Sequence, residues 1–327
     1  MRDRWAKLHI LRIISIIIIT LALIVVASHF AHLTTWLNNL MGNMDYNPDI
    51  KENAAEHAGE NRFANRDRVF ATVNKYAKIM KEVNIKSYDG TRLSGSYILG
   101  ENPNLRVILI HGYTARNITM FTIADRYHKK GYSVLAPDLR GHGKSSGFLT
   151  TYGIKESKDM FCWIDRIKSQ NKNAKIILQG ESLGAATAMY VIGQNPKEVI
   201  ACIEDCGYTT YYGMFEHQAH KRLRFLYKPA ALIANLFIKP LIGADLFKST
   251  EEAIKKTKIP TLFIHGAKDD IVPIQMCYTL YDSHPGKKQI YISQGTDHAE
   301  NKLFDEEVYY GRIFGFLDEV VGENKSV

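Results

Sequence analysis

Short apolar runs alternate with helical stretches through most of the chain after residue 100. The runs predict strands at residues 107–110, 132–136, 175–179, 199–203, 261–264 and 289–292. The stretches between or after them predict helices at about residues 152–169, 183–194 and 304–321. Unbroken apolar strands separated by helices are typical of a parallel sheet that is covered on both faces. We therefore predict an α/β domain whose functional residues lie at the carboxyl ends of the strands.

The segment before this alternation predicts a hairpin and a helix. Residues 83–87 and 94–99 have the pattern of strands, and the Asp89-Gly90 pair between them is typical of a tight hairpin turn. Upstream of the hairpin, apolar side chains recur near one face of a predicted helix, which we expect to pack on the domain: Phe63, Phe70, Val73, Tyr76 and Met80.

The longest apolar run lies near the N-terminus, at residues 13–27, and is interrupted only by Ser15 and Thr20. Extended to residue 33 and built as a helix, it would reach about 32 Å, which marginally spans a bilayer. Basic residues precede the run and are then absent until Lys51. The positive-inside rule therefore predicts a cytoplasmic N-terminus and an external domain. The preceding cations are Arg2, Arg4, Lys7 and Arg12.

We favour an uncleaved anchor in the cell membrane. A signal peptide cleaved near Ala27 would instead give a secreted protein, and a buried core helix is a third alternative. The predicted organisation is a cytoplasmic basic tail at 1–12, a single-pass transmembrane signal-anchor at 13–33, a linker and helix at 34–81, and an external catalytic domain at 82–327 with an inserted cap at about 207–250.

Composition and charge narrow the class of protein. With 46% hydrophobic and 23% charged residues, the chain is neither disordered, collagen-like nor polytopic. The net charge of +8 is concentrated in two stretches, 1–35 and 207–258, and forms no stripe across the domain. We therefore predict no nucleic-acid partner, and hypothesise that basic residues of the cap face an anionic membrane or head group: Lys221, Arg222, Arg224, Lys228 and Lys239.

The four cysteines are too few for a disulfide framework, and no spacing typical of a zinc site accompanies them. We expect them to be buried as small hydrophobic residues. They are Cys162, Cys202, Cys206 and Cys277.

Residues 180–184 have the Gly-x-Ser-x-Gly form of a nucleophile elbow, and they lie between a predicted strand and a predicted helix. Glycine is needed at both ends because the turn is tight and neighbouring backbone comes close. Ser182 is therefore the predicted nucleophile. A serine hydroxyl is a weak nucleophile until a base accepts its proton.

The predicted base is His298, which follows the sixth predicted strand of the α/β alternation. A carboxylate must orient it, and the segment after the fifth strand offers Asp269 and Asp270. The order Ser182, Asp269, His298 is the chain order of α/β hydrolases. Asp297 is also near, but its side chain is expected to point away because it adjoins His298.

The oxyanion that forms in acyl transfer needs backbone N–H donors. Leu183, directly after the nucleophile, is predicted to supply one of them. Tyr113, in the His111-Gly112-Tyr113-Thr114 loop after an early strand, is predicted to supply the other. Arg116 and Glu181 are candidate substrate contacts.

The chain resembles the α/β-hydrolase fold family over about residues 82–321. The resemblance rests on four segments in order: HGYT at 111–114, DLRGHGKSSG at 138–147, GESLG at 180–184, and HGAKDDIVP at 265–273 with GTDHAE at 295–300. More narrowly, it is similar to membrane-anchored bacterial hydrolases of the serine aminopeptidase-like branch. That pattern implies Asp269 as the acid. The HGGG loop of many lipases is absent, and the serine nucleophile is unlike the aspartate of dehalogenases and epoxide hydrolases.

The resemblance implies a mostly parallel central sheet flanked by helices, with a helical cap inserted over the active site. The segment between the fourth and fifth strands is too long for a simple connection and is rich in aromatic residues. These residues either indicate an apolar acyl or aromatic substrate group or attach the cap to the core.

We therefore predict a serine hydrolase that cleaves a carboxylic ester, or less favourably an amide, through an acyl-enzyme. This chemistry requires no metal or cofactor, and its expected partners are a small ester or acyl substrate and the membrane. An acyltransferase would use the same triad. A non-catalytic surface-binding protein on this scaffold is the third alternative.

Overall fold

The computed structural model describes residues 60–147, 149–223 and 227–323. The predicted tail and anchor, and most of the linker, lie outside these residues. Within the described part of the chain, no helix combines the length and the apolarity that a membrane crossing requires.

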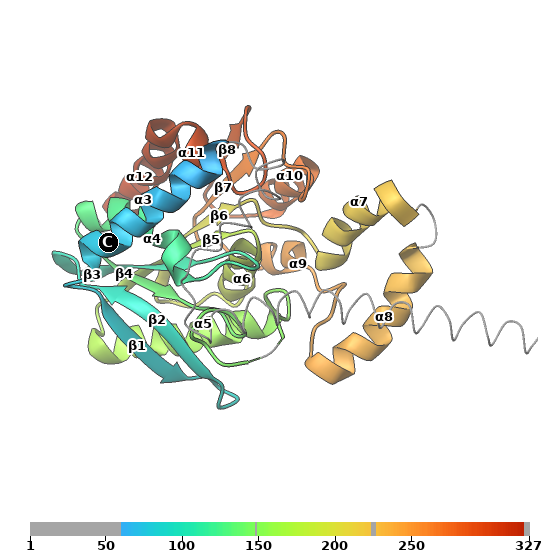
Figure 1. The fold of residues 1–327 in the computed structure, drawn as a ribbon, viewed down its shortest axis with the longest axis horizontal. Coiled ribbons are helices and arrows are strands. Elements are labelled where there is room, and N and C mark those ends of the chain that lie inside the picture. Colours follow the sequence, from blue (N-terminus) through green and yellow to red (C-terminus); the bar gives the residue numbers. More distant parts are fainter. Residues whose placement is uncertain (1–59, 148, 224–226, 324–327) are drawn as a thin grey trace, which may run out of the picture.

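An eight-stranded sheet runs through the centre of the domain in the order β1-β2-β4-β3-β5-β6-β7-β8 (Figure 1). Strand β2 pairs antiparallel with both β1 and β4, and all pairs from β4 onward are parallel. The strands are β1 (Lys81–Lys86), β2 (Arg92–Ile98), β3 (Asn102–Ile110), β4 (Tyr132–Pro137), β5 (Lys175–Glu181), β6 (Val199–Asp205), β7 (Thr261–Gly266) and β8 (Lys288–Ser293).

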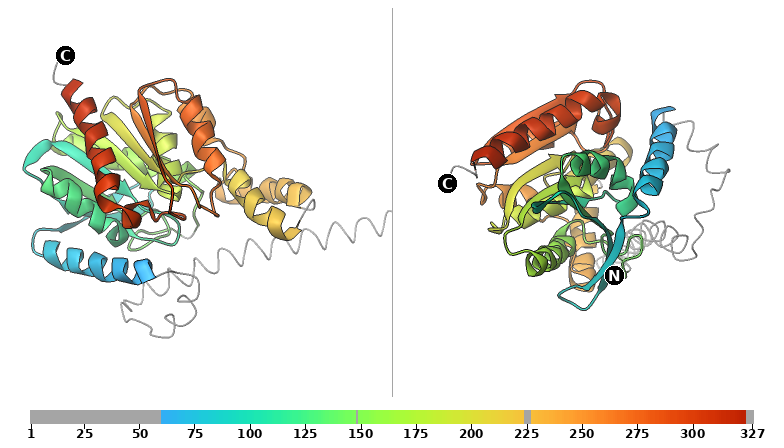
Figure 2. Two further views of the ribbon diagram at one scale, coloured as in Figure 1. Left: turned by 90° about the horizontal axis from the view of Figure 1, so that it is seen from above. Right: turned by 90° about the vertical axis from the view of Figure 1, so that its left-hand side faces the viewer.

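Two hydrophobic cores form because both faces of the central strands are apolar. Along β3, Val107 and Leu109 point into one core, and Ile108 and Ile110 into the other. The first core contains residues of α3 (Glu60–Tyr76), α4 (Phe121–Lys129) and α12 (Glu306–Glu323). The second contains residues of α5 (Ile154–Gln170), α6 (Leu183–Ile192) and α10 (Ile274–Ser283), so helices cover both faces of the sheet (Figure 2).

The remaining helices are short or belong to the insertion between β6 and β7. The short ones are η1 (Asn117–Met120) and α11 (Asn301–Phe304). The insertion contains α7 (Tyr211–Leu223), α8 (Tyr227–Ile242) and α9 (Thr250–Ile254). In Figure 1, α7 and α8 project from one side of the sheet domain.

The strands and helices predicted from periodicity are present at nearly the predicted positions. The predicted hairpin is β1–β2, with Gly90 at a φ of +83° that suits glycine. The face predicted for the first helix was partly wrong. Val73, Tyr76 and Met80 pack on the first core as predicted, although Met80 lies beyond the helix end. Phe70 is exposed, and its neighbour Val69 is buried instead.

The junction of β3, β5 and α6 leaves no room for side chains at the two glycines of the elbow. A Cβ at Gly184 would collide with the carbonyl oxygen of Ile110 and lie 2.8 Å from that of His111. A Cβ at Gly180 would lie 2.5 Å from the backbone nitrogen of Ala185 and collide with Gly184. The requirement for glycine at both ends of the motif is therefore steric.

We expect Gly184→Ala to destabilise the protein by about 3 kcal/mol or more, because the colliding atoms are backbone atoms that cannot rotate away. Gly311→Ala is the matched control. A methyl group at Gly311, in α12, would meet no neighbouring part of the described chain within 4 Å, so alanine should stabilise the helix by about 0.5–1 kcal/mol. Urea unfolding of the two variants measures both effects. Equal stability of the two would contradict the steric argument.

Candidate active site

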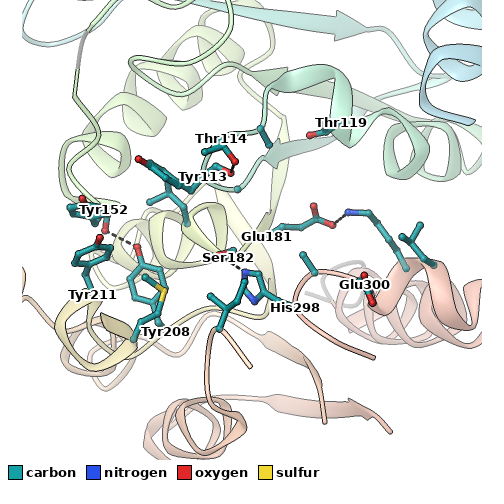
Figure 3. A pocket seen from close by; sticks show the side chains of 18 residues that line it. Tyr113, Thr114, Thr119, Tyr152, Glu181, Ser182, Tyr208, Tyr211, His298 and Glu300 are labelled. Carbon is teal, nitrogen blue, oxygen red and sulfur yellow. Dashed lines mark hydrogen bonds and ion pairs between the residues drawn. The ribbon is translucent and has the colours of Figure 1, made fainter. Parts of the chain in front are cut away.

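A pocket of about 480 Å³ opens at the carboxyl ends of the central strands (Figure 3). The pocket is lined by residues from the end of β5, the loop after β3 and the segment after β8, among other elements. Its lining residues are Gly112, Tyr113, Thr114, Ala115, Thr119, Tyr152, Glu181, Ser182, Leu183, Tyr208, Tyr211, Met214, Ile271, His298, Ala299, Glu300, Lys302 and Leu303.

Ser182 occupies the sharp turn from β5 into α6. Its φ of +54° and ψ of −109° lie in a region that residues with a side chain rarely adopt. The backbone N–H of Ser182 donates to the carbonyl oxygen of Asp205 on β6 at 2.8 Å, which helps to hold the turn. The strain is thus retained by the surrounding packing, and it exposes the hydroxyl to the pocket.

The Ser182 hydroxyl lies 2.9 Å from Nε2 of His298, and Nδ1 of the same ring lies 2.8 Å from Oδ2 of Asp269. The other oxygen of Asp269 accepts the backbone N–H groups of Ile271 and Val272 at 3.0 and 2.8 Å. These bonds fix the carboxylate, which in turn places the proton of neutral His298 on Nδ1 and leaves Nε2 to accept from Ser182.

The carboxylates of Asp297 and Asp270, which adjoin His298 and Asp269 in the sequence, are placed differently from that of Asp269. Asp297 accepts the backbone N–H of its neighbour His298 at 2.7 Å and that of Asp270 at 3.3 Å, so its carboxylate ties two loops together. Asp270 is exposed. Of the two acids offered after β7, the structure therefore brings Asp269 to the imidazole.

The loop after β3 is held by His111, which is fully buried. Its Nε2 accepts the backbone N–H of Leu139 at 3.0 Å, so Nδ1 carries the proton and donates to the carbonyl oxygen of Gly112 at 2.7 Å. In a trans peptide the N–H points opposite to the C=O. The N–H of Tyr113 is therefore directed away from His111, and both Tyr113 and Leu183 line the pocket beside Ser182.

Comparisons with known proteins support the fold described above. The family model described as "Serine aminopeptidase, S33" matches residues 101–211. The chain overlays on the Pyrococcus furiosus esterase Pf2001 with a TM-score of 0.62 and 25% identity, covering 76% of this chain and 95% of the esterase. The chain has the α/β-hydrolase fold, and the matched family model and the esterase neighbour support a hydrolase.

Proteins similar to this α/β hydrolase occur in distantly related organisms. An uncharacterised Bacillus subtilis protein, YqkD, is 29% identical over 243 residues, which are 72% of this chain and 78% of YqkD. The Arabidopsis thaliana α/β hydrolase domain-containing protein WAV2 is 24% identical over 270 residues, 76% of this chain and 82% of WAV2.

A buried ion pair lies beside Ser182. Lys302 donates to the carboxylate of Glu181, and both side chains are less than a tenth exposed. Because Glu181 precedes Ser182 and Lys302 follows His298 by four residues, the pair joins the elbow to the loop that carries the imidazole. Glu181 also lines the pocket, with one of its oxygens bound to Lys302.

Below this pair, Asp205 accepts the amide of Asn301 at 2.7 Å and the hydroxyl of Tyr309 at 2.8 Å. Burial raises the pKa of Asp205 to about 7, and the nearby Glu181 adds to the rise. Thr296 donates to Asn301 at 2.7 Å, so the segment from 296 to 302 is fixed to the sheet at several points.

Tyrosines from three elements form one wall of the pocket. Tyr152, from the turn before α5, stacks on Tyr211 of α7 with ring centroids 3.5 Å apart, and Tyr208 donates to the carbonyl oxygen of Tyr152 at 3.2 Å. Tyr152 has a φ of +54°, and buried Glu156 accepts the N–H groups of Thr151 and Gly153 on either side of it. The turn is thus built to present this ring.

The described part of the insertion contributes three residues to the pocket, namely Tyr208, Tyr211 and Met214. Its other described apolar residues either attach it to the domain or face outward. Ile238, Ala244 and Leu246 form a small core, whereas Leu232, Leu236 and Leu241 are largely exposed.

Arg116 and one of the five cap cations named in the sequence analysis have described side chains. Arg116 stands directly before η1 and is not among the described residues that line the pocket. Lys239 pairs with Asp245 at 2.7 Å, and the side chains of the other four predicted cap cations lie outside the described residues.

Sequence reasoning missed Thr119, Tyr152, Glu300 and Lys302. For Lys302, the signal was its spacing of four residues after His298 before a helix. Tyr152 had only the Tyr-Gly pair ahead of a predicted helix, a pattern that does not identify a pocket residue.

The four cysteines are free thiols, and all except Cys162 are buried. Cys206 lies with Asp269 and His298 in a group whose polar atoms are within 4.8 Å of one another. Burial raises the pKa of the Cys206 thiol well above its ordinary value, so it stays protonated and is a poor metal ligand. Asp269 and His298 are already engaged with each other, so we derive no metal site from this group.

The fully buried Glu204 makes the stability of this hydrolase depend on pH. Burial raises the pKa of Glu204 to about 8, and Asp205 and Asp269 add to the rise. Between about pH 4.5 and 8 the folded protein retains a proton that the unfolded chain has lost, so stability falls as the pH rises through this window.

We expect Glu204→Gln to gain stability relative to the natural protein between pH 5 and pH 8, by at least about 1 kcal/mol, because the amide does not titrate. Urea unfolding at a series of pH values measures this difference. Exposed Glu101→Gln makes the same substitution on the surface and is the control. A pH-independent difference for Glu204→Gln would rule out a buried neutral carboxyl at this position.

Proposed function

We propose that this hydrolase cleaves carboxylic esters by a two-step acyl-enzyme mechanism. The observation that carries the proposal is the continuous hydrogen-bonded chain from Ser182 through His298 to Asp269 at the base of a pocket. The esterase activity named for the Pyrococcus furiosus neighbour supports an ester rather than an amide as substrate.

In the first step, Ser182 Oγ attacks the ester carbonyl while Nε2 of His298 accepts its proton. Asp269 holds the ring and stabilises the imidazolium that forms. The backbone N–H groups of Leu183 and Tyr113 donate to the oxyanion. Nε2 then protonates the leaving alcohol oxygen, and the acyl group remains on Ser182.

In the second step, water enters and His298 accepts one of its protons as the oxygen attacks the acyl carbonyl. Collapse of the second oxyanion returns the proton to Ser182 and releases the acid. The residues named supply nucleophile, base and oxyanion donors, so the proposal does not invoke a metal or cofactor.

The first test is labelling by a fluorophosphonate, which reacts with an activated serine. We expect the natural protein to be labelled and Ser182→Ala not to be labelled, because Ser182 is the serine that His298 can activate. Mass spectrometry of the labelled peptide identifies the site. Absence of labelling in a folded natural protein would refute the proposal.

The adjacent aspartates provide a matched pair within the same assay. Asp269→Asn should lower kcat/KM for a p-nitrophenyl ester by about 10³–10⁴-fold, because an amide N–H₂ facing Nδ1 favours the wrong tautomer of His298. Asp270→Asn, one residue away and exposed, should stay within about twofold of the natural enzyme. Equal losses in the two variants would contradict the role given to Asp269.

We also propose that residues 13–33 anchor the enzyme in the cell membrane with its catalytic domain outside. The support is the apolar run and the four cations that precede it. The exposed leucines of α8 are compatible with a position of the catalytic domain close to a lipid surface.

The full-length protein should remain in the membrane pellet after carbonate extraction and should retain Met1 at its N-terminus, because an uncleaved apolar helix holds it there. Protease added to intact cells should digest the catalytic domain. A soluble product that begins just after Ala27 would instead establish secretion.

A further inference from the structure

The pocket differs in chemistry on the two sides of Ser182. In Figure 3, Tyr152, Tyr208 and Tyr211 lie on one side of the serine, and Glu181, Glu300 and Thr119 lie on the other. We call the second group, together with Lys302, the polar end of the pocket. A substrate whose carbonyl is at Ser182 therefore meets aromatic rings in one direction and hydrogen-bonding groups in the other.

The polar end offers mainly hydrogen-bond acceptors. The Thr119 hydroxyl already donates to the carbonyl oxygen of Arg116 at 2.7 Å, so toward a ligand it can only accept. The carboxylates of Glu181 and Glu300 are also acceptors when ionised. Lys302 is the donor among the four residues, and it is bound to Glu181. The excess of acceptors fits a ligand group that carries O–H donors.

The carboxylates of the polar end disfavour a ligand group that carries negative charge. Two carboxylates and one ammonium leave the polar end with an excess of negative charge when all three are ionised. An anionic substituent such as a carboxylate or phosphate would be repelled there and would find few donors. The favoured substituent is therefore hydroxylated and without negative charge.

The position of His298 indicates which half of the ester enters the polar end. Glu300 and Lys302 belong to the same short segment as His298, whose Nε2 must protonate the leaving oxygen in the proposed mechanism. The leaving alcohol is thus expected on the side of this segment, and the acyl group on the side of the tyrosines.

We propose that the polar end is a leaving-group subsite that selects alcohols bearing a further hydroxyl group, while an apolar acyl group packs against Tyr152, Tyr208 and Tyr211. This proposal rests on the ester hydrolysis proposed above. It adds the chemical class of the alcohol and assigns Thr119 and Glu300 as residues that determine specificity.

Four esters of one apolar acid, phenylacetic acid, test the proposal with the full-length enzyme. Their alcohols are propanol, ethylene glycol, choline and glycolic acid, and each kcat/KM is divided by the rate of hydroxide-catalysed hydrolysis to remove intrinsic reactivity. We expect the hydroxyethyl ester to exceed the propyl ester about tenfold, as one or two hydrogen bonds would give. The carboxymethyl ester should be the poorest substrate.

The choline ester separates charge from hydrogen bonding, because it is cationic but has no O–H donor. A choline ester faster than the hydroxyethyl ester would overturn the proposal, and so would equal rates for the propyl and hydroxyethyl esters. If no ester is hydrolysed and Ser182 is not labelled, it is the proposed ester hydrolysis itself that fails.

Two variants on different elements test whether the polar end causes the preference for a hydroxylated alcohol. Thr119→Val removes an acceptor at nearly constant shape, and Glu300→Gln replaces half of a carboxylate by a donor. Each should lower the ratio of hydroxyethyl to propyl ester kcat/KM several-fold. Glu307→Gln, an exposed acid on α12 outside the pocket, is the control and should keep the ratio. An unchanged ratio in both Thr119→Val and Glu300→Gln would contradict the assignment of the polar end.

Discussion

The arrangement of the site depends on the close approach of α6 to the end of β3. The helix can begin directly under the sheet edge only because Gly184 has no side chain to meet the carbonyl oxygens of Ile110 and His111. That approach places the strained Ser182 beside the loop that holds Tyr113. A nucleophile and the N–H groups proposed to stabilise its oxyanion are thus brought together by one steric constraint, before any catalytic side chain is considered.

Buried ionisable side chains are the second feature that organises the site. Four of them gather where an ordinary core would hold apolar residues. Glu181, Lys302, Glu204 and Asp205 lie at the ends of β5 and β6 or in the segment packed on them, all with less than a tenth of their surface exposed. An ionised group in such a place is stable only with a partner. Lys302 provides one for Glu181, whereas the raised pKa of Glu204 indicates that this group remains protonated instead.

The sequence predicted the parts of the site that local motifs define. Ser182, Asp269 and His298 each follow a predicted strand, and parallel strands bring their carboxyl ends to one edge. The tyrosine wall could not be predicted in the same way, because Tyr152, Tyr208 and Tyr211 come from separate connections that meet only in three dimensions. The helix α3 shows the same limit: periodicity gave its position, but the choice between Val69 and Phe70 as the buried residue depends on where α4 lies.

The distinction between Asp205 and Asp269 shows why chemistry cannot be assigned from position alone. Both carboxylates stand at or just after the ends of adjacent parallel strands, and both lie near the His298 loop. The two oxygens of Asp205 accept Asn301 and Tyr309, so it has become part of the support for that loop. Asp269 directs Oδ1 to backbone N–H groups of its own turn, and its Oδ2 lies 2.8 Å from Nδ1 of His298 and 3.3 Å from Nε2 of His265. The acid that can orient His298 is therefore the one whose own turn satisfies only half of its hydrogen-bonding capacity.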